Sequence, residues 1–404
     1  MMLRAHKIEL RINNKQATYF AKACGAARKA YNWALDEWQK QYQAGGKPNE
    51  AALRRQLNSI KHKEFPWMLE VTKNAPQMAI MQLGVAFKNF FAKRANHPTF
   101  RKKWIDDRFT LTNDQFAIND SRIRIPHLGW VRMRESLRYT GKIVSATISR
   151  CAHKWFVSIT VEMKQPATPI ANENQVAVGV DLGLHHFATL STGEKIAGPK
   201  PQKALMNRLR RLSRGLSRKQ KGSRNRDKAK IKLARLHYRI GNIRRDTQHQ
   251  LTSRLVNDFN IIGIEDLHVK GMMKNRRLSR SIADMGFHEF RRQLEYKTLS
   301  VGAKLVIADR WFASSKMCSC CGEKAGSLSL SIREWTCDSC FIRHDRDINA
   351  AKNLEHLAVS STVSANPVKR VAHACGASSD GVVTSVIASH GALKQESSVI
   401  AIYG

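Results

Sequence analysis

Apolar and polar residues follow two different periods along the first part of the chain. Residues 4–12 alternate apolar and charged side chains, which predicts a β-strand. Residues 15–95 then carry apolar and aromatic side chains mostly at helical spacing, with one Gly- and Pro-containing break at residues 45–49. Residues 109–162 return to short alternating segments, typical of about five strands. This order predicts a small β-barrel with a helical insertion after its first strand.

The second half of the chain favours an α/β domain. A polar stretch at residues 165–169 indicates a linker, and beyond it apolar runs of strand length alternate with helical patterns. The predicted strands are residues 176–182, 186–191, 261–265 and 304–307, and the predicted helices lie around residues 231–255 and 287–299. From residue 359 the chain is rich in Ser, Ala, Val and Gly without steady periodicity, so we expect residues 359–404 to be poorly ordered.

The composition indicates a negatively charged partner. The 404 residues include 69 Lys and Arg against 32 Asp and Glu, a net charge of +37. Such a charge favours binding to polyanions, nucleic acids above all. An anionic membrane is the alternative, but no apolar run approaches the roughly 20 residues needed to span a bilayer. The first residues also lack the apolar core of a secretion signal, so we expect a cytosolic protein that acts on nucleic acid and has no membrane partner.

Positive charge is densest in residues 200–250, which hold 18 Lys and Arg against two Asp. The middle of this stretch, residues 213–223, is predicted to be a loop, and its second half a helix. Contact with a nucleic-acid backbone is the favoured interpretation, and a helix with a solvated basic face is the alternative. The candidate contact residues are Arg214, Arg218, Lys219, Lys221 and Arg224.

Four of the eight cysteines form two pairs with the spacing of a zinc ribbon. Cys318-x2-Cys321 is followed, after 15 residues, by Cys337-x2-Cys340. Four thiolates at tetrahedral corners would bind one Zn²⁺ in a structural role, because they leave no open position on the metal. Cys320 is the alternative to Cys321, but the resulting Cys318-x-Cys320 is too tight for a usual knuckle. Paired cysteines of this kind also favour a reducing compartment.

Three carboxylates stand where an acidic side chain is costly to bury. Asp181 lies inside an apolar run, Glu265 ends another, and Asp347 follows the second cysteine pair. A carboxylate in an apolar strand is unfavourable unless it is paired or binds a metal. Brought together by folding, the three would hold two divalent cations for phosphodiester cleavage, with Mg²⁺ expected and Mn²⁺ as a substitute. Asp266 and Asp345 are neighbouring acids that compete for the second and third positions.

The same residues carry a family resemblance. The chain resembles the TnpB family of bacterial insertion sequences, which are compact RNA-guided DNA endonucleases related to type V CRISPR effectors. The matching segments are residues 178–183, 212–214, 217–223, 264–272, 290–294 and 309–312, the cysteine ribbon, and residues 344–351. Weaker likeness extends through residues 28–34 and 141–161, so the resemblance covers nearly everything but the tail.

The resemblance implies catalytic roles for Asp181, Glu265 and Asp347. The family pattern Asp-x-Asn-Ala-Ala selects Asp347 over Asp345 at the third position. All three positions keep carboxylates, which argues against the nuclease-dead relatives of the family. Two departures, Ala313 in place of a common Pro and Phe341 in place of a common Gly, affect local turns.

The fold implied is an α/β RNase H-like (RuvC) nuclease domain with a zinc-ribbon insertion, preceded by a wedge-type β-barrel with a helical recognition insertion. The expected boundaries are residues 1–14 for the first barrel strand, 15–108 for the helical recognition domain, 109–168 for the remaining barrel, 169–312 and 344–358 for the two nuclease parts, 313–343 for the zinc ribbon, and 359–404 for the tail.

The function implied is cleavage of double-stranded DNA next to a short adjacent motif, directed by a guide RNA from the element's own transcript. An RNA-guided DNA-binding repressor without cleavage is one alternative, and it requires a broken metal site. A transposase or recombinase acting without a guide is another. A basic zinc-ribbon RNA-binding protein is a third, but it leaves Asp181 and Glu265 unexplained. The sequence leaves the oligomeric state open.

Overall fold

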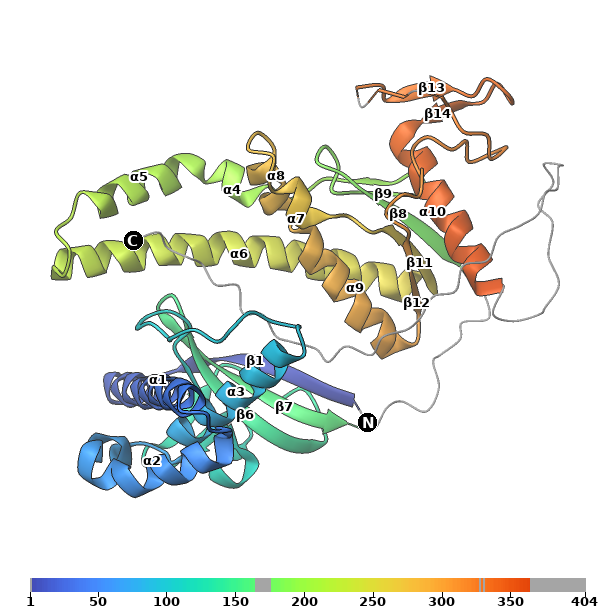
Figure 1. Cartoon of the computed structure of the whole chain (residues 1–404). Helices are drawn as coiled ribbons and strands as arrows, with labels where there is room; N and C mark the ends of the chain where they lie inside the picture. Colours follow the sequence, from blue (N-terminus) through green and yellow to red (C-terminus); the bar gives the residue numbers. More distant parts are fainter. Residues whose placement is uncertain (1, 164–175, 327, 330, 364–404) are drawn as a thin grey trace. The chain divides into compact units, whose positions relative to one another are not determined.

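The computed structural model describes residues 2–163, 176–326, 328–329 and 331–363. Contacts divide the chain into two compact units whose boundary falls between residues 165 and 166, and each unit is described by itself (Figure 1). The predicted linker and the predicted tail beyond residue 363 lie outside the described residues. None of the helices in the described ranges combines the length and the apolar character needed to cross a bilayer.

The helices of the first unit form where apolar spacing predicts them. They are α1 (Asn14–Gln43), α2 (Glu50–Glu64) and α3 (Asn74–Phe91), with a short 3-10 turn η1 (Pro66–Glu70) before α3. Asn13 and Gln16 cap α1 reciprocally, since each side chain accepts a hydrogen bond from the other residue's backbone N–H. The helix ends at the predicted break, where Gly45 takes a φ of +79° that favours glycine.

The strands of the first unit form one antiparallel sheet. They are β1 (Met2–Arg11), β2 (Arg108–Thr112), β3 (Ala117–Asn119), β4 (Arg122–Ile125), β5 (Gly129–Met133), β6 (Lys142–Cys151) and β7 (Lys154–Met163). Their order is β2-β6-β7-β1-β5-β4-β3, so the N-terminal strand pairs with strands from beyond the helices, as predicted. Among the described residues no pairing joins β2 to β3. The structure therefore has an open sheet instead of a closed barrel. Beyond the helices it contains six strands where about five were predicted, because the shortest strands are too brief to show a period.

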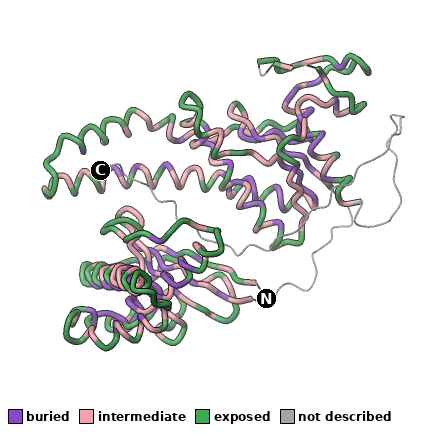
Figure 2. The backbone as a smooth tube through the Cα atoms, viewed as in Figure 1, coloured by how far each residue is buried: buried purple, intermediate pink, exposed green. Residues whose placement is uncertain are grey.

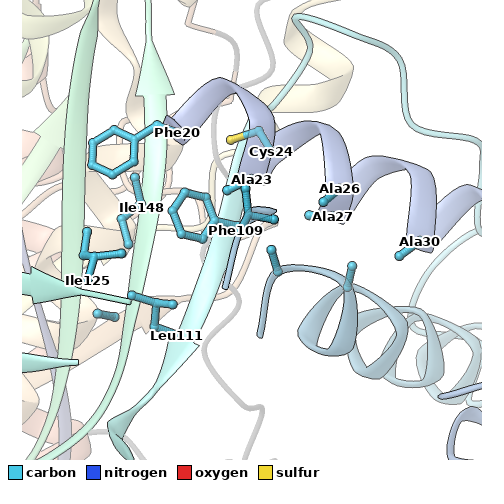
Figure 3. Close-up of a cluster of buried hydrophobic side chains, with 14 of the residues drawn as sticks. Phe20, Ala23, Cys24, Ala26, Ala27, Ala30, Phe109, Leu111, Ile125 and Ile148 are labelled. Atoms are coloured by element: carbon cyan, nitrogen blue, oxygen red, sulfur yellow. The ribbon is translucent and has the colours of Figure 1, made fainter. Parts of the chain in front are cut away.

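The core of this unit lies between the sheet and the helices. Figure 3 shows Phe20 of α1 beside Phe109 of β2, above Ile125 and Ile148 of the sheet. The ring of Phe20 lies 6.0 Å from that of Phe109 and 5.2 Å from that of Trp155, centroid to centroid. Helical spacing thus brings to one face of α1 the side chains that pack on the sheet.

The second unit contains a five-stranded mixed sheet. Its strands are β8 (Ala177–Leu182), β9 (Ala188–Leu190), β10 (Lys195–Ile196), β11 (Ile261–Glu265) and β12 (Lys304–Ala308), in the order β10-β9-β8-β11-β12. β8, β11 and β12 run parallel to one another, and β9 pairs antiparallel with both of its neighbours, β8 and β10. Three antiparallel strands continued by parallel ones form the RNase H-like arrangement expected from the sequence.

The helices of the second unit are α4 (Pro201–Ala204), α5 (Met206–Ser217), α6 (Arg224–Asp258), α7 (Val269–Met272), α8 (Ser279–Met285), α9 (Phe287–Val301) and α10 (Arg346–Val363). Two predictions are wrong here. The loop expected at residues 213–223 is helical as far as Ser217, because Leu209, Leu212 and Leu216 continue a helical stripe that the intervening Gly and Ser residues obscure.

The second correction concerns the start of the tail. α10 continues to Val363, so residues 359–363 are helical instead of part of a poorly ordered segment. Hydroxyl groups conceal the helix in the sequence, but here they donate within it. The Ser361 hydroxyl bonds to the carbonyl of Leu357 at 2.7 Å, and that of Thr362 to the carbonyl of Ala358.

Candidate active site and cysteine ribbon

Asp181 and Glu265 lie level with each other on two neighbouring parallel strands. In the register of β8 and β11, Gly179 lies opposite Gly263. Two residues further along each strand stand Asp181 and Glu265. Because side chains two apart point to the same face of a sheet, both carboxylates share the face of the paired glycines.

The paired glycines let α10 lie directly on the sheet. A Cβ atom at Gly179 would stand 1.8 Å from the carbonyl oxygen of Ala351, and a Cβ at Gly263 would stand 2.4 Å from that of Leu354. A side chain at either position would therefore push the helix away from the strands. We call Gly179 and Gly263 the glycine platform.

Asp347 reaches the same place from α10. It lies in the first turn of the helix, one turn before Ala351, which rests on the glycine platform. Asp347, Ala351, Leu354 and Ala358 form one stripe at helical spacing, and the last three are fully buried. The stripe directs Asp347 toward the sheet end that carries Asp181 and Glu265.

The three carboxylates interact electrostatically. Burial raises the pKa of Asp181 well above its ordinary value, and the charges of Glu265 and then Asp347 raise it further. Burial likewise raises the pKa of Glu265, offset in part by the hydroxyl of Ser314, which donates to Glu265 Oε1 at 2.5 Å. A bound cation would stabilise the ionised forms of Asp181 and Glu265, which burial disfavours.

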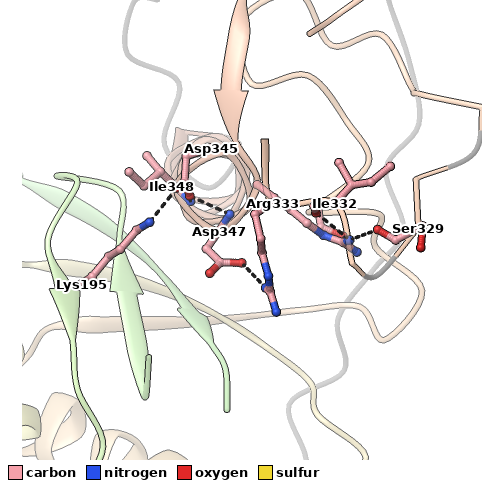
Figure 4. Close-up of polar contacts among 9 residues, drawn as sticks. Lys195, Ser329, Ile332, Arg333, Asp345, Asp347 and Ile348 are labelled. Atoms are coloured by element: carbon pink, nitrogen blue, oxygen red, sulfur yellow. Dashed lines mark hydrogen bonds and ion pairs between the residues drawn. The ribbon is translucent and has the colours of Figure 1, made fainter. Parts of the chain in front are cut away.

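Two arginines that were not predicted from the sequence act on this cluster, and Figure 4 shows one of them, Arg333, directed toward Asp347. Arg333, from the segment between the cysteine pairs, donates to Asp347 Oδ1 at 3.4 Å while its side chain remains half exposed. Arg346 is buried and donates to the backbone carbonyls of Ser329 and Ile332 at 2.6 and 3.4 Å. Both charges act to lower the pKa of Asp181. No motif marks Arg333, because its approach depends on the fold of the ribbon.

The two competing acids have other partners. Asp345 Oδ1 accepts the backbone N–H groups of Asp347 and Ile348 at the start of α10, and its Oδ2 pairs with Lys195 at 2.6 Å (Figure 4). Burial acts to raise the pKa of Asp345, but these hydrogen bonds lower it overall. Asp345 therefore caps the helix that carries Asp347.

Asp266 is held in an arginine clamp next to Glu265. Its two oxygens pair with Arg291 at 2.5 Å and Arg310 at 2.7 Å. Burial acts to raise its pKa, and hydrogen bonds from both arginines lower it overall. An acid already neutralised by two guanidinium groups is a poor metal ligand, so the geometry separates Asp266 from Glu265.

The carboxylate cluster fits hard divalent cations. Carboxylate oxygens are the ligands that Mg²⁺ takes from proteins. Within the described ranges, only the four cysteines place three or more donor atoms within 4.8 Å of one another, so the three carboxylates are spread more widely. Asp181, Glu265 and Asp347 are the residues that would hold such cations.

A cavity of about 330 Å³ opens beside Glu265. Its wall includes apolar side chains such as Leu182 and Phe287, and it carries the titratable side chains of Lys270, His288, Arg291, Arg292, Glu265 and Glu295. Arg291 pairs with Asp266 and with Glu295, and Arg292 pairs with Glu289, so carboxylates offset part of the positive charge of this wall. None of these basic residues was predicted as a contact, although Arg291 and Arg292 fall within a segment that carries the family resemblance.

The four predicted zinc ligands come together in a ribbon between β12 and α10. Cys318 Sγ lies 3.6 Å from Cys340 Sγ, Cys321 Sγ lies 3.6 Å from Cys337 Sγ, and all four sulfurs are within 4.8 Å of one another. A tetrahedral ZnS₄ site with Zn–S bonds of about 2.3 Å has sulfurs about 3.8 Å apart. The donor set therefore fits Zn²⁺, and it contains Cys321 instead of Cys320. The backbone N–H of Cys340 lowers the pKa of the Cys337 thiol to about 7, whereas the pKa values of the other three thiols are raised, so a bound cation would be needed to hold all four as thiolates.

The ribbon leads straight into the active-site helix. Its hairpin, β13 (Glu334–Thr336) and β14 (Arg343–Asp345), ends at the residue before α10 begins. His344 in this hairpin is buried, and its Nε2 lies 3.0 Å from Cys318 Sγ. Metal ligands commonly take hydrogen bonds from such neighbours. The sequence analysis missed His344, since nothing in the spacing distinguishes a fifth group near four cysteines.

The backbone conformation at Phe341 explains why glycine is common at this position in the family. It follows the second cysteine pair with a φ of +57°, as Gly322 follows the first with a φ of +80°. A left-handed conformation costs a residue with a Cβ about 1–2 kcal/mol, and Phe341 is 79% exposed, so it gains little from packing.

We therefore expect Phe341→Gly to stabilise the ribbon by about 0.5–1 kcal/mol, after allowance for the greater freedom of glycine in the unfolded chain. The rate at which a chelator removes zinc measures this effect. Phe341→Ala is the matched control, because it removes the ring but keeps the Cβ. Equal zinc retention in the two variants would contradict the backbone argument.

The five predicted nucleic-acid contacts gather at the tip of a helical hairpin. Arg214 lies in α5, Arg224 begins α6, and Arg218, Lys219 and Lys221 lie in the turn between them; all five are exposed. Figure 2 shows mainly exposed and half-buried positions along this end of α5 and α6.

The turn at the hairpin tip is fixed internally. Arg226 Nη1 donates to the carbonyls of Leu216 and Lys219 at 3.1 and 2.8 Å, and Ser223 caps the start of α6. The tip therefore presents positive charge on an ordered turn. We call it the basic tip.

Three family models match the chain. One described as "Probable transposase" covers residues 158–276, one described as "Cas12f1-like, TNB domain" covers residues 287–354, and one described as "Helix-turn-helix domain" covers residues 1–47. The third description does not fit the described structure, in which residues 2–47 form strand β1 and the single continuous helix α1.

Relatives match along most of the chain. A "Putative RNA-guided DNA endonuclease" from Streptomyces pristinaespiralis is 39% identical over 365 residues, covering 87% of this chain and 88% of its own. "Putative RNA-guided DNA endonuclease InsQ" from Escherichia coli (strain K12) is 34% identical over 370 residues, covering 87% and 91%. A solved structure titled "Cryo-EM structure of the Cas12f1-sgRNA-target DNA complex" has the same fold, with a TM-score of 0.54 at 13% identity over 85% of this chain and 83% of that chain.

The fold and site define an RNase H-like protein with a carboxylate cluster at the end of its sheet and a cysteine ribbon before its last helix. With relatives of 39% and 34% identity along most of its length, the chain belongs to the TnpB family.

Proposed function

We propose that this protein is an RNA-guided endonuclease that cleaves double-stranded DNA beside a short adjacent motif by metal-dependent hydrolysis at Asp181, Glu265 and Asp347. The general activity, a DNA endonuclease, is that of its named relatives. The observation that carries the proposal is the convergence of three carboxylates from β8, β11 and α10, close enough that two of them raise the pKa of the third.

The roles of the residues follow from their positions. Two divalent cations bound at the cluster would activate a water molecule and stabilise the leaving 3′ oxygen. Asp181 interacts with both other acids, and together with Glu265 and Asp347 it would hold these cations. Arg333, half exposed beside Asp347, would contribute a positive charge to a phosphate bound at these carboxylates.

Guide and target are expected to bind through their phosphates. The partners are a guide RNA from the element's own transcript and double-stranded target DNA, whose sequence is read by base pairing. The basic tip and the net charge of +37 support this proposal, because such a hybrid requires many contacts to its phosphates.

Removing two charges from the basic tip tests this interface. We expect Arg218→Ala with Lys219→Ala to weaken binding about equally for all guide sequences, since phosphate contacts carry no sequence information. The logarithmic dependence of affinity on salt should become shallower, by up to roughly 0.9 per lost duplex contact or 0.7 per single-strand contact. Affinities for RNA and for guided target DNA are measured across a salt series.

The control for net charge is Lys61→Ala with Lys63→Ala on α2, which removes the same charge from the other unit. If the salt dependence of affinity changes equally in both double variants, or in neither, then the basic tip is a solvated face, which is the alternative interpretation of the sequence.

The co-purifying nucleic acid distinguishes the proposal from its rivals. A guided nuclease should carry one discrete RNA, and sequencing should place that RNA at the end of the element's transcript. A recombinase acting without a guide, the sense in which "Probable transposase" could apply, should carry none. The RNA-guided repressor would carry RNA but leave target DNA intact in Mg²⁺. The three retained carboxylates favour cleavage over that alternative.

A further inference from the structure

The ribbon is joined to the active site by a buried set of polar contacts at its base. Ser314, the second residue of the ribbon segment predicted at 313–343, is 4% exposed, and its hydroxyl donates to Glu265 Oε1 at 2.5 Å. Asn353 of α10 is 2% exposed, and its Nδ2 donates to the carbonyl of Ser314 at 2.8 Å and to that of Met317 at 2.6 Å. One side chain of the helix thus fixes the backbone whose hydroxyl holds Glu265.

A second asparagine secures the first cysteine knuckle to the same helix. Asn349 is 1% exposed, and its Nδ2 donates to the carbonyl of Met317 at 2.7 Å while its Oδ1 accepts the N–H of Ser319 at 2.8 Å. Met317 and Ser319 flank Cys318, a candidate zinc ligand. Asn349 and Asn353 are one turn apart and therefore lie on one face of α10.

Two faces of α10 contact different parts of the protein. The stripe that begins with Asp347 lies on the glycine platform, whereas the stripe of Asn349 and Asn353 binds the ribbon base. Asp347 and Glu265 belong to elements far apart in sequence, and Ser314 joins them through Asn353. A buried carboxylate that accepts a hydrogen bond only from a flexible side chain would be free to rotate. Here Asn353 fixes the backbone of Ser314, so the Ser314 hydroxyl holds the Glu265 carboxylate in one orientation.

We propose that Ser314 is a positioning residue of the nuclease site, which orients the Glu265 carboxylate for cation binding, and that the ribbon base is the device that fixes Ser314 relative to Asp347. The proposal rests on the proposed function, because it assigns the hydroxyl a role toward the same metal site. The order of the chain supports it: the segment between Glu265 and Asp347 passes through Ser314 and then through the cysteine knuckles. The ribbon thereby shapes the carboxylate cluster in addition to any contact it makes with nucleic acid.

The test compares Ser314→Ala, Ser314→Thr and Ser361→Ala in the full chain with its RNA. Ser361→Ala is the matched control, since it removes a hydroxyl that bonds only within α10 at an exposed position. Three quantities are measured: zinc content, Mn²⁺ binding by electron paramagnetic resonance, and cleavage rate as a function of Mg²⁺ concentration.

We expect Ser314→Ala to retain zinc and RNA but to bind Mn²⁺ about 10-fold or more weakly, the usual effect of losing a group that orients a metal ligand. Its cleavage deficit should shrink as Mg²⁺ is raised. Ser314→Thr keeps the hydroxyl and should recover most of the affinity, and Ser361→Ala should match the parent.

Adding Ser314→Ala to Glu265→Gln identifies the route of the effect. If Ser314 acts through Glu265, then Ser314→Ala should weaken Mn²⁺ binding much less in the Glu265→Gln variant than in the parent protein. Unchanged Mn²⁺ affinity in Ser314→Ala would overturn the proposal, and so would loss of its zinc, which would assign Ser314 to folding of the ribbon. Failure of the parent itself to bind Mn²⁺ or to cleave would instead reject the proposed function.

Discussion

Asp181→Ala is expected to abolish cleavage of target DNA, by more than about 10³-fold, while binding of guide RNA and target survives. Removal of a single preorganised group from an active site commonly costs about 10²–10³-fold, and Asp181 is the acid whose pKa responds to both others. Binding depends on phosphate contacts elsewhere, so it should change little. A cleavage assay in Mg²⁺ beside a gel-shift assay measures both effects.

Glu265→Ala and Asp347→Ala should behave alike, and Asp345→Ala is their matched control. Asp345 caps α10 and pairs with Lys195, so its loss should lower stability and leave measurable cleavage. Full activity of Asp347→Ala together with loss of activity in Asp345→Ala would transfer the third position to Asp345.

The same aspartate makes a prediction about stability without Mg²⁺. Burial and two neighbouring carboxylates raise the pKa of Asp181. Its favourable contribution to folding is therefore present below its ordinary pKa of about 3.9 and lost as pH rises through the raised value. In Mg²⁺-free buffer at pH 7.5, Asp181→Asn should melt at a higher temperature than the parent, and the difference should shrink toward pH 4. A lower melting temperature for Asp181→Asn at pH 7.5 would contradict the electrostatic account.

The second large effect is expected at the ribbon. Cys321→Ser should lose zinc, because the energy of thiolate–zinc bonds, about 10–16 kcal/mol in small zinc domains, is folding energy for such a segment. Cleavage should fall with it, since the ribbon carries Ser314 and Arg333 to the carboxylates. Metal analysis of the purified protein and the cleavage assay measure the two consequences.

Cys320→Ser is the matched control in the adjacent position. It should retain one zinc ion per chain, because Cys320 is not among the four sulfurs within 4.8 Å of one another. Equal loss of zinc in the two variants would mean that the first knuckle uses a different pair of cysteines.

The sequence predicted those parts of the fold that depend on local pattern. Strands with uniformly apolar residues, such as 261–265, were placed at their observed bounds, and the carboxylate at their ends marked the site. The cysteine spacing predicted a cluster that the structure brings together. These features are visible in the sequence because a buried strand and a four-cysteine metal site each depend on short segments of the chain.

Features that depend on contacts between distant segments were not visible. Gly179 and Gly263 look like ordinary strand glycines until the backbone of α10 is placed on them. Arg333 and Ser314 stand in segments without periodicity, and their roles come from the way the ribbon folds back onto the sheet. The first residues of the predicted loop, 213–217, belong to a helix. This was not visible in the sequence because Gly and Ser lower helix propensity, and the packing of Leu216 outweighs that loss.

The most direct test of the account is cleavage by the protein purified with its own RNA, in Mg²⁺, of a duplex matching the guide segment of that RNA. The account predicts that only the matched duplex is cut, that the cut moves to a new sequence when the guide segment is replaced, and that Asp181→Ala abolishes it. Cleavage that persists after the RNA is removed, or that ignores the guide sequence, would contradict RNA-guided hydrolysis at Asp181, Glu265 and Asp347.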